Sequence, residues 1–140
     1  MPHSSEIYTL GYAAWTVEEV VEQAQTLDAI LVDVRRAPYT TKPGFKKEEL
    51  RSRFGDRYVH IPGFGNVNYE GGPIELAQPE EGLDAIRALS RPPILMCGCT
   101  SPTQCHRSTV ATLLAEQMDA DVTHLRSPSE RAQPDLFEGQ

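Results

Sequence analysis

The sequence lacks any long run of apolar residues. A membrane-spanning helix needs about 18 or more consecutive apolar residues, and no stretch of the 140-residue chain approaches that length. The N-terminus also lacks a basic segment followed by an apolar one, which is the pattern of a secretory signal. We therefore expect a cytoplasmic protein that has no membrane partner.

Positive charge is also in short supply. The chain has 13 lysine and arginine residues against 20 aspartate and glutamate residues, so its formal net charge is −7. Proteins that bind the phosphate backbone of nucleic acid need a basic surface, so nucleic acid is a disfavoured partner. A local basic site for a small anionic ligand is compatible with this composition.

Cysteine is scarce, and its three copies are clustered. Cys97, Cys99 and Cys105 all lie within nine residues of sequence. An odd number of cysteines in a chain expected in the cytoplasm argues against a framework of structural disulfides. The cluster therefore marks a local site or arises by chance.

Short apolar runs alternate with amphipathic stretches along most of the chain. Residues 29–34 form a short run rich in β-branched residues, which is typical of a strand buried on both faces of a parallel sheet. Thr16 and Glu19 have the spacing of a capping box, which predicts that a helix begins at residue 17. The alternation predicts an α/β fold, a three-layer α/β/α arrangement with a mostly parallel sheet of about five strands.

The expected strands and helices fill one domain. Periodicity is lost after residue 126, so we expect a single domain over residues 1–126 and a flexible C-terminal tail over residues 127–140. The expected strands are residues 7–10, 29–34, 57–61, 93–97 and 121–125. The expected helices begin near residues 17, 46, 79 and 105, and residues 62–78 show no regular pattern.

The strongest candidate site joins the fourth expected strand to the last helix. In a parallel sheet, ligands bind at the carboxyl ends of the strands, and the N-terminus of a helix attracts anions. A cysteine in that position ionises more easily and becomes a better nucleophile. We therefore predict Cys97, Cys105 and His106 as catalytic residues, and Arg107 and Ser108 as anion-binding residues. The alternative is that the cysteines pack in the core and Arg107 lies at the surface.

Polar residues at the ends of other strands form a supporting group. Asp33 and Arg35 lie two positions apart, so both side chains point to the same side of a strand. Arg35 is expected to bind an anion or to pair with Asp33. Tyr12 and His60 also follow strands, and His60 could act as an acid or base or be a structural residue.

Three functions fit these residues. The first is a small enzyme in which Cys97 or Cys105 is the nucleophile and Arg35 and Arg107 hold an anionic group. The second is a non-catalytic module that binds a nucleotide or a nucleic-acid end, because no complete set of nucleophile, base and orienting residue is evident. The third is a metal or redox-sensing site on the cysteine cluster. The cysteine spacing is not a familiar zinc pattern, so we expect no metal.

Five short segments together resemble the domain of unknown function 488 (DUF488) family. They occur in the family's order within residues 6–126: residues 9–12, 31–38, 45–50, 58–62 and 105–107. The resemblance implies a small bacterial or archaeal α/β protein and supplies no established activity, cofactor or substrate. The family commonly has Gly-His-Ser where this chain has Gly11-Tyr12-Ala13, and often an acidic residue at the position of Cys99. These departures imply altered or lost chemistry if those polar residues carry it.

The layout is also similar to that of rhodanese-like domains. In those domains a nucleophilic cysteine ends a strand, and an arginine near the start of the next helix closes a tight loop. Here nine residues separate Cys97 from Arg107, which is too many for such a compact loop.

Overall fold

The computed structural model describes residues 5–35, 40–68, 73–98 and 106–128. Its strands form one parallel sheet in the order β3-β2-β4-β1-β5, so the predicted α/β fold is confirmed. The strands are β1 (Ser5–Gly11), β2 (Ile30–Asp33), β3 (Tyr58–His60), β4 (Pro93–Cys97) and β5 (Ala120–His124). The helices are α1 (Val17–Leu27), α2 (Lys47–Phe54), α3 (Pro79–Arg87) and α4 (His106–Met118).

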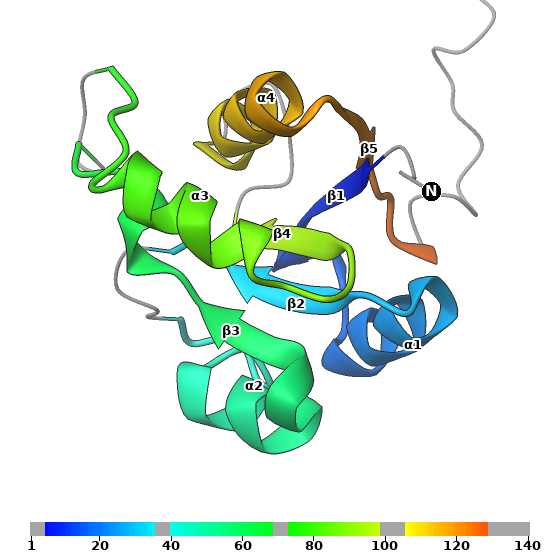
Figure 1. The fold of residues 1–140 in the computed structure, drawn as a ribbon. Coiled ribbons are helices and arrows are strands. Elements are labelled where there is room, and N and C mark those ends of the chain that lie inside the picture. Colours follow the sequence, from blue (N-terminus) through cyan, green and yellow to red (C-terminus); the bar gives the residue numbers. More distant parts are fainter. Residues whose placement is uncertain (1–4, 36–39, 69–72, 99–105, 129–140) are drawn as a thin grey trace, which may run out of the picture.

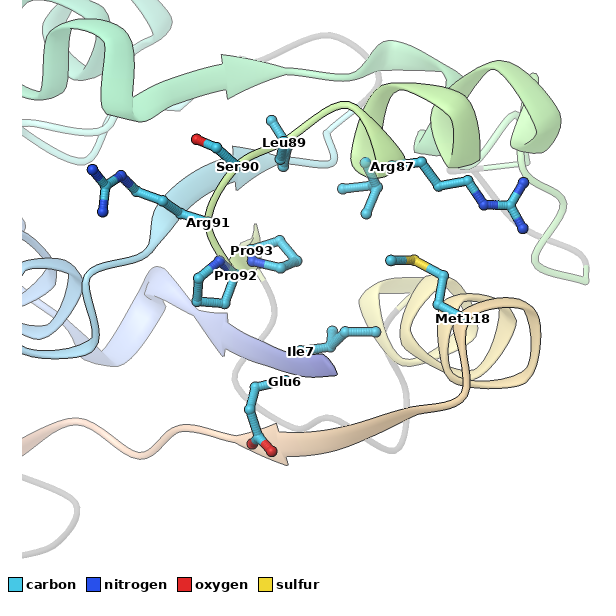
Figure 2. A pocket seen from close by; sticks show the side chains of 10 residues that line it. Glu6, Ile7, Arg87, Leu89, Ser90, Arg91, Pro92, Pro93 and Met118 are labelled. Atoms are coloured by element: carbon cyan, nitrogen blue, oxygen red, sulfur yellow. The ribbon is translucent and has the colours of Figure 1, made fainter. Parts of the chain in front are cut away.

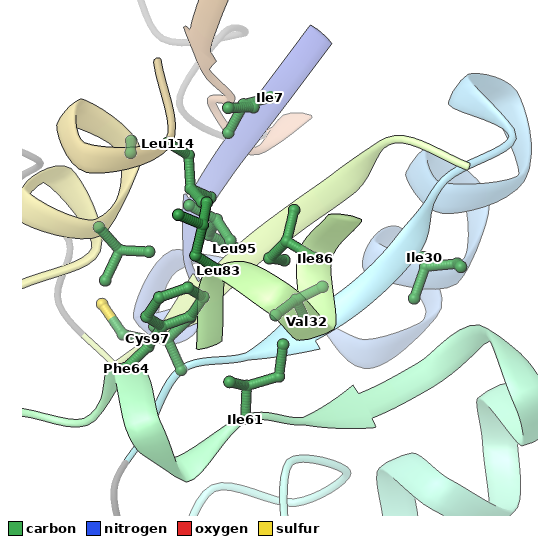
Figure 3. Close-up of a cluster of buried hydrophobic side chains, with 13 residues drawn as sticks. Ile7, Ile30, Val32, Ile61, Phe64, Leu83, Ile86, Leu95, Cys97 and Leu114 are labelled. Atoms are coloured by element: carbon green, nitrogen blue, oxygen red, sulfur yellow. The ribbon is translucent and has the colours of Figure 1, made fainter. Parts of the chain in front are cut away.

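Helices cover both faces of the sheet, with α3 and α4 on one face and α1 and α2 on the other (Figure 1). Side chains alternate between the faces of each strand, and β4 shows the result. Leu95 and Cys97 belong to the buried cluster under α3 and α4, which Figure 3 shows from close by. Ile94 and Met96 belong to the buried cluster on the α1 and α2 side. Both faces of this central strand are therefore packed, as the continuous apolar run predicts.

The first helix begins as its sequence predicts. The backbone N–H of Glu19 donates to the Thr16 hydroxyl at 3.1 Å, and the Glu19 carboxylate accepts from the backbone N–H of Thr16 at 2.8 Å. The helix ends at Asp28, whose φ of 53° places it in the left-handed region that terminates many helices. The capping box and the left-handed C-cap thus define the two ends of α1.

The chain leaves the neighbouring strands β2 and β4 in opposite directions along the sheet, so its direction reverses between them. After β1 the chain crosses through α1 to β2 and through α2 to β3, with both helices on one face. After β3 it returns through α3 to β4 and continues through α4 to β5, with both helices on the other face. In sheets of this kind, ligands bind outside the carboxyl ends of the two strands at the reversal. Asp33 ends β2 and Cys97 ends β4 at that point, where Asp33 is paired in register with Met96.

Some segments differ from the sequence prediction. Within residues 62–78, which show no sequence pattern, the structure contains a 3-10 turn at Pro62–Phe64 and an isolated bridge between Asn66 and Leu76. Ser127, the first residue of the predicted tail, is fully buried, and residues 129–140 lie outside the described ranges. Within the described ranges, no helix has the length and apolar character needed to cross a membrane.

Candidate functional site

Cys97 and Arg107 meet at the reversal point of the sheet. Cys97 is the last residue of β4 and is 1% exposed, and its sulfur is disulfide-bonded. Arg107 is the second residue of α4, and it too is only 1% exposed. Its Nη1 lies 3.6 Å from Sγ of Cys97. The arginine reaches the cysteine although nine residues separate them, and the alternative of a surface position for Arg107 is wrong.

Two residues that the sequence analysis missed complete this group. Nε of Arg107 donates to the hydroxyl of Thr9 at 3.3 Å, and the same hydroxyl lies 2.6 Å from Nδ1 of His124. Thr9 and His124 are direct partners in the ladder between β1 and β5. Burial and the positive charge of Arg107 lower the pKa of His124. The only sequence signals were a hydroxyl inside an apolar strand and a histidine at a strand end.

Asp33 and Arg35 form a buried ion pair on the other face of the sheet. Nε and Nη2 of Arg35 donate to the two carboxylate oxygens of Asp33 at 2.8 and 2.6 Å. The hydroxyl of Tyr58 donates to the same carboxylate at 2.7 Å. Burial alone would lower the pKa of Arg35, but its hydrogen bonds and charge interaction with Asp33 outweigh burial, so the pKa is raised. The pairing that the two-residue spacing predicts is therefore present.

The remaining nitrogen of the Arg35 guanidinium, Nη1, does not bond to Asp33. Nη1 of Arg35 is buried and has no hydrogen-bond acceptor among the described residues. The guanidinium lies over the ring of Tyr12, 5.3 Å from its centroid, and Tyr12 stacks on Phe45 at 4.6 Å. A buried donor without an acceptor is costly. Asp33 and Tyr12 thus hold the Arg35 guanidinium from two sides.

His60 is tied to the backbone beside this pair. Its Nε2 lies 2.6 Å from the carbonyl oxygen of Arg35, which can only accept, so Nε2 is the donor. This bond joins the end of β3 to the residue that follows the end of β2. The geometry gives His60 a structural role in holding the Arg35 backbone.

The structure places the two predicted arginines on opposite faces of the sheet. Arg107 lies with Cys97 beneath α4, whereas Arg35 lies with Tyr12 on the side of α1 and α2. Because the two guanidinium groups lie on opposite faces, their joint hold on one anion stays a prediction.

The other predicted site residues are only partly described. Ser108 is half-buried in the first turn of α4. For His106 the backbone alone is described, and Cys99 and Cys105 lie outside the described residues. In the part of the chain that is described, no group of three or more histidine, cysteine or acidic side chains could hold a metal ion.

The cavities lined by described residues lie away from this group. A cavity of about 380 Å³ opens near the beginnings of β1 and β4, where Ile7, Arg87, Pro93 and Met118 are among its lining residues (Figure 2). Two further cavities lie beside α1 and α2. These cavities therefore do not mark the polar groups at the carboxyl ends of the strands.

Comparison with known proteins finds a family match over part of the chain. The family model described as Domain of unknown function DUF488 matches residues 16–72, which confirms the resemblance predicted from the sequence. The matched segment includes Asp33, Arg35 and His60, and it ends before Cys97 and Arg107. No curated protein and no solved structure matches the chain.

Proposed function

We propose from the site that the chain, of which residues 16–72 match the DUF488 family model, is a thiol-dependent enzyme for a small anionic substrate. The observation that carries the proposal is the 3.6 Å contact between Arg107 Nη1 and Cys97 Sγ at the reversal point of the sheet. Reduced Cys97 is the nucleophile, and Arg107 stabilises its thiolate and attracts the anionic group of the substrate.

Burial strengthens this interaction. Both residues are 1% exposed, and a charge pair interacts more strongly where water is excluded. A thiolate at this distance from a guanidinium is favoured over a neutral thiol. The same guanidinium provides the planar donors that bind oxyanions well.

The second predicted arginine supplies a further anion contact in this proposal. Asp33 holds Arg35 through two hydrogen bonds, and Nη1 of Arg35 has no acceptor among the described residues. An oxygen atom of the ligand would satisfy that donor. Asp33, Tyr12 and His60 then act as supporting residues, because each contacts Arg35 or its backbone.

The disulfide at Cys97 favours redox sensing as a second candidate function. A disulfide-bonded sulfur is not a nucleophile, so the proposed enzyme works only after reduction. The chain has three cysteines, and one disulfide consumes two of them. We expect mass spectrometry after alkylation in denaturant to count one free thiol per chain without reductant and three after reduction. Three free thiols in protein never exposed to reductant would contradict the redox role.

Anion binding provides the test of the proposed substrate class. We expect phosphate or sulfate to raise the melting temperature of the reduced protein above that in chloride of equal ionic strength. At ten times the dissociation constant, the stabilisation is about 1.4 kcal/mol, or roughly 4 °C for a domain of this size. Arg107→Gln should abolish the shift, and Arg35→Gln should reduce it.

Arg51 offers a matched control for these variants. It is an exposed arginine on α2, away from the carboxyl ends of the strands, so Arg51→Gln should retain the full anion-dependent shift. If Arg107→Gln fails to fold, Arg107→Lys takes its place, because it keeps the buried charge. An equal shift in chloride and phosphate, or a full shift in both Arg107 variants, would exclude the proposed anion site.

A further inference from the structure

A chain of hydrogen bonds leads from the edge of the sheet to the buried arginine of the site. His124 ends the edge strand β5 and is exposed, and its Nδ1 lies 2.6 Å from the hydroxyl oxygen of Thr9. That oxygen accepts a hydrogen bond from Nε of Arg107 at 3.3 Å. Nη1 of the same guanidinium lies 3.6 Å from Sγ of Cys97. Thr9 is 0% exposed, so it bridges the exposed imidazole and the buried guanidinium.

The chain of hydrogen bonds has a direction. The Thr9 oxygen accepts from Arg107, because a guanidinium can only donate, and its own proton is donated to Nδ1 of His124 in the tautomer that carries no proton at Nδ1. Neutral His124 then accepts at Nδ1 and carries its proton at Nε2. Protonation of His124 adds a proton at Nδ1, so the imidazolium must donate to the oxygen that already accepts from Arg107. Two cations then share one hydroxyl.

We propose that Thr9 and His124 are positioning residues that hold the Arg107 guanidinium beside Cys97 and make the thiol responsive to the protonation of His124. The inference rests on the proposed function, in which Arg107 acts on the reduced thiol. Neutral His124 supports the bridge through Thr9. The imidazolium weakens it, because it repels the guanidinium and removes the acceptor of the Thr9 proton.

The surroundings of His124 are consistent with this role. The charged group that faces the imidazole from α4 is Arg107, and its ladder partner on β1, Thr9, is uncharged. Burial and the Arg107 charge lower the pKa of His124, so the imidazole is neutral at neutral pH and gains its proton below the ordinary value of about 6.5. Other titratable residues of the two strands occupy positions that alternate to the opposite face: Glu6, Tyr8 and Asp121.

The test is the pH profile of alkylation of Cys97 by iodoacetamide. The reduced protein with Cys99→Ser and Cys105→Ser, here called the single-thiol protein, reports Cys97 alone. We expect its rate to fall more steeply than one ionisation allows once the pH drops below the ordinary histidine pKa of about 6.5. His124→Asn keeps a polar side chain that does not titrate, and it should reduce the profile to a single ionisation.

Thr9→Val removes the bridging hydroxyl at nearly constant volume. We expect it to lower the alkylation rate at pH 7 by about three- to tenfold, because one tenfold step corresponds to roughly 1.4 kcal/mol of lost thiolate stabilisation. Thr123→Val is the matched control, since Thr123 is exposed on β5 and alternates to the other face. Thr9→Ser retains the hydroxyl and should restore the parent profile.

The outcomes separate this inference from the proposed function. If Thr9→Val and His124→Asn leave the parent profile unchanged while Arg107→Gln shifts it, the positioning role is overturned and the proposed function stands. If Arg107→Gln also leaves the profile unchanged, both fail. A change in the maximal rate alone, with no change in the pH dependence, reports access to the thiol and also counts against the positioning role.

Discussion

Replacing Asp33 by asparagine is expected to lower the free energy of unfolding by about 3–5 kcal/mol, because it leaves a buried guanidinium without its counter-charge. The Asp33 carboxylate accepts four hydrogen bonds: from the backbone N–H, Nε and Nη2 of Arg35 at 3.1, 2.8 and 2.6 Å, and from the Tyr58 hydroxyl at 2.7 Å. Asparagine has one acceptor oxygen and turns an NH₂ group toward these donors.

Urea denaturation of the parent and variant measures this effect. Asp84→Asn is the control, because Asp84 is exposed on α3 and should change the unfolding free energy by less than about 0.5 kcal/mol. The double variant Asp33→Asn with Arg35→Gln should recover part of the loss, because the buried cation is removed as well. A loss for Asp33→Asn no greater than that of the control would refute the structural importance of the pair.

Gly82→Ala should destabilise the protein although it lies within a helix. In an exposed helix interior, alanine is about 1 kcal/mol more favourable than glycine. Here a Cβ at Gly82 would lie within 2.7 Å of Cδ1 and Cζ of Phe64. The ring is fully buried in the cluster that contains Cys97, so it cannot move away freely. Overpacking of this kind costs about 1–3 kcal/mol, and after the gain from helix propensity we expect a net loss of about 1–2 kcal/mol.

Whether Gly82→Ala lowers or raises the stability depends on the ring of Phe64. A variant without that ring therefore provides the control. In a Phe64→Leu background the ring atoms that meet the new Cβ are absent. There we expect Gly82→Ala to be neutral or stabilising, as helix propensity predicts. The four unfolding free energies of this double-mutant cycle measure the coupling. If alanine stabilises the parent protein, α3 is not packed on Phe64 as closely as the structure shows.

Local patterns were sufficient to predict several elements of the fold. The strand Pro93–Cys97 matches its predicted bounds, because the apolar run is bordered by prolines and by Gly98. The first helix begins after Thr16, as the capping box predicts. The order of the strands could not be predicted in the same way, because pairing such as that between Gly11 and Cys97 depends on contacts far apart in sequence.

The residues of the candidate site could be proposed from the sequence, but most of the contacts between them could not. The carboxyl ends of parallel strands indicated Cys97, Asp33 and Arg35, and the structure contains the predicted pair between the last two. The role of Thr9 was not predictable, because it depends on the register that places this residue beside His124. The burial of Arg107 likewise follows from the packing of α4 on the sheet, which no local pattern indicates.

In the proposed enzyme, Arg107 stabilises the thiolate of reduced Cys97. The most direct test of this stabilisation is the pH at which alkylation of the single-thiol protein reaches half of its maximal rate, because the maximum reports access and the midpoint reports charge. We predict a midpoint at least about one unit below the value near 8.5 of an ordinary thiol, and a return toward that value in Arg107→Gln. A midpoint at or above 8.5 that Arg107→Gln does not change would contradict the account.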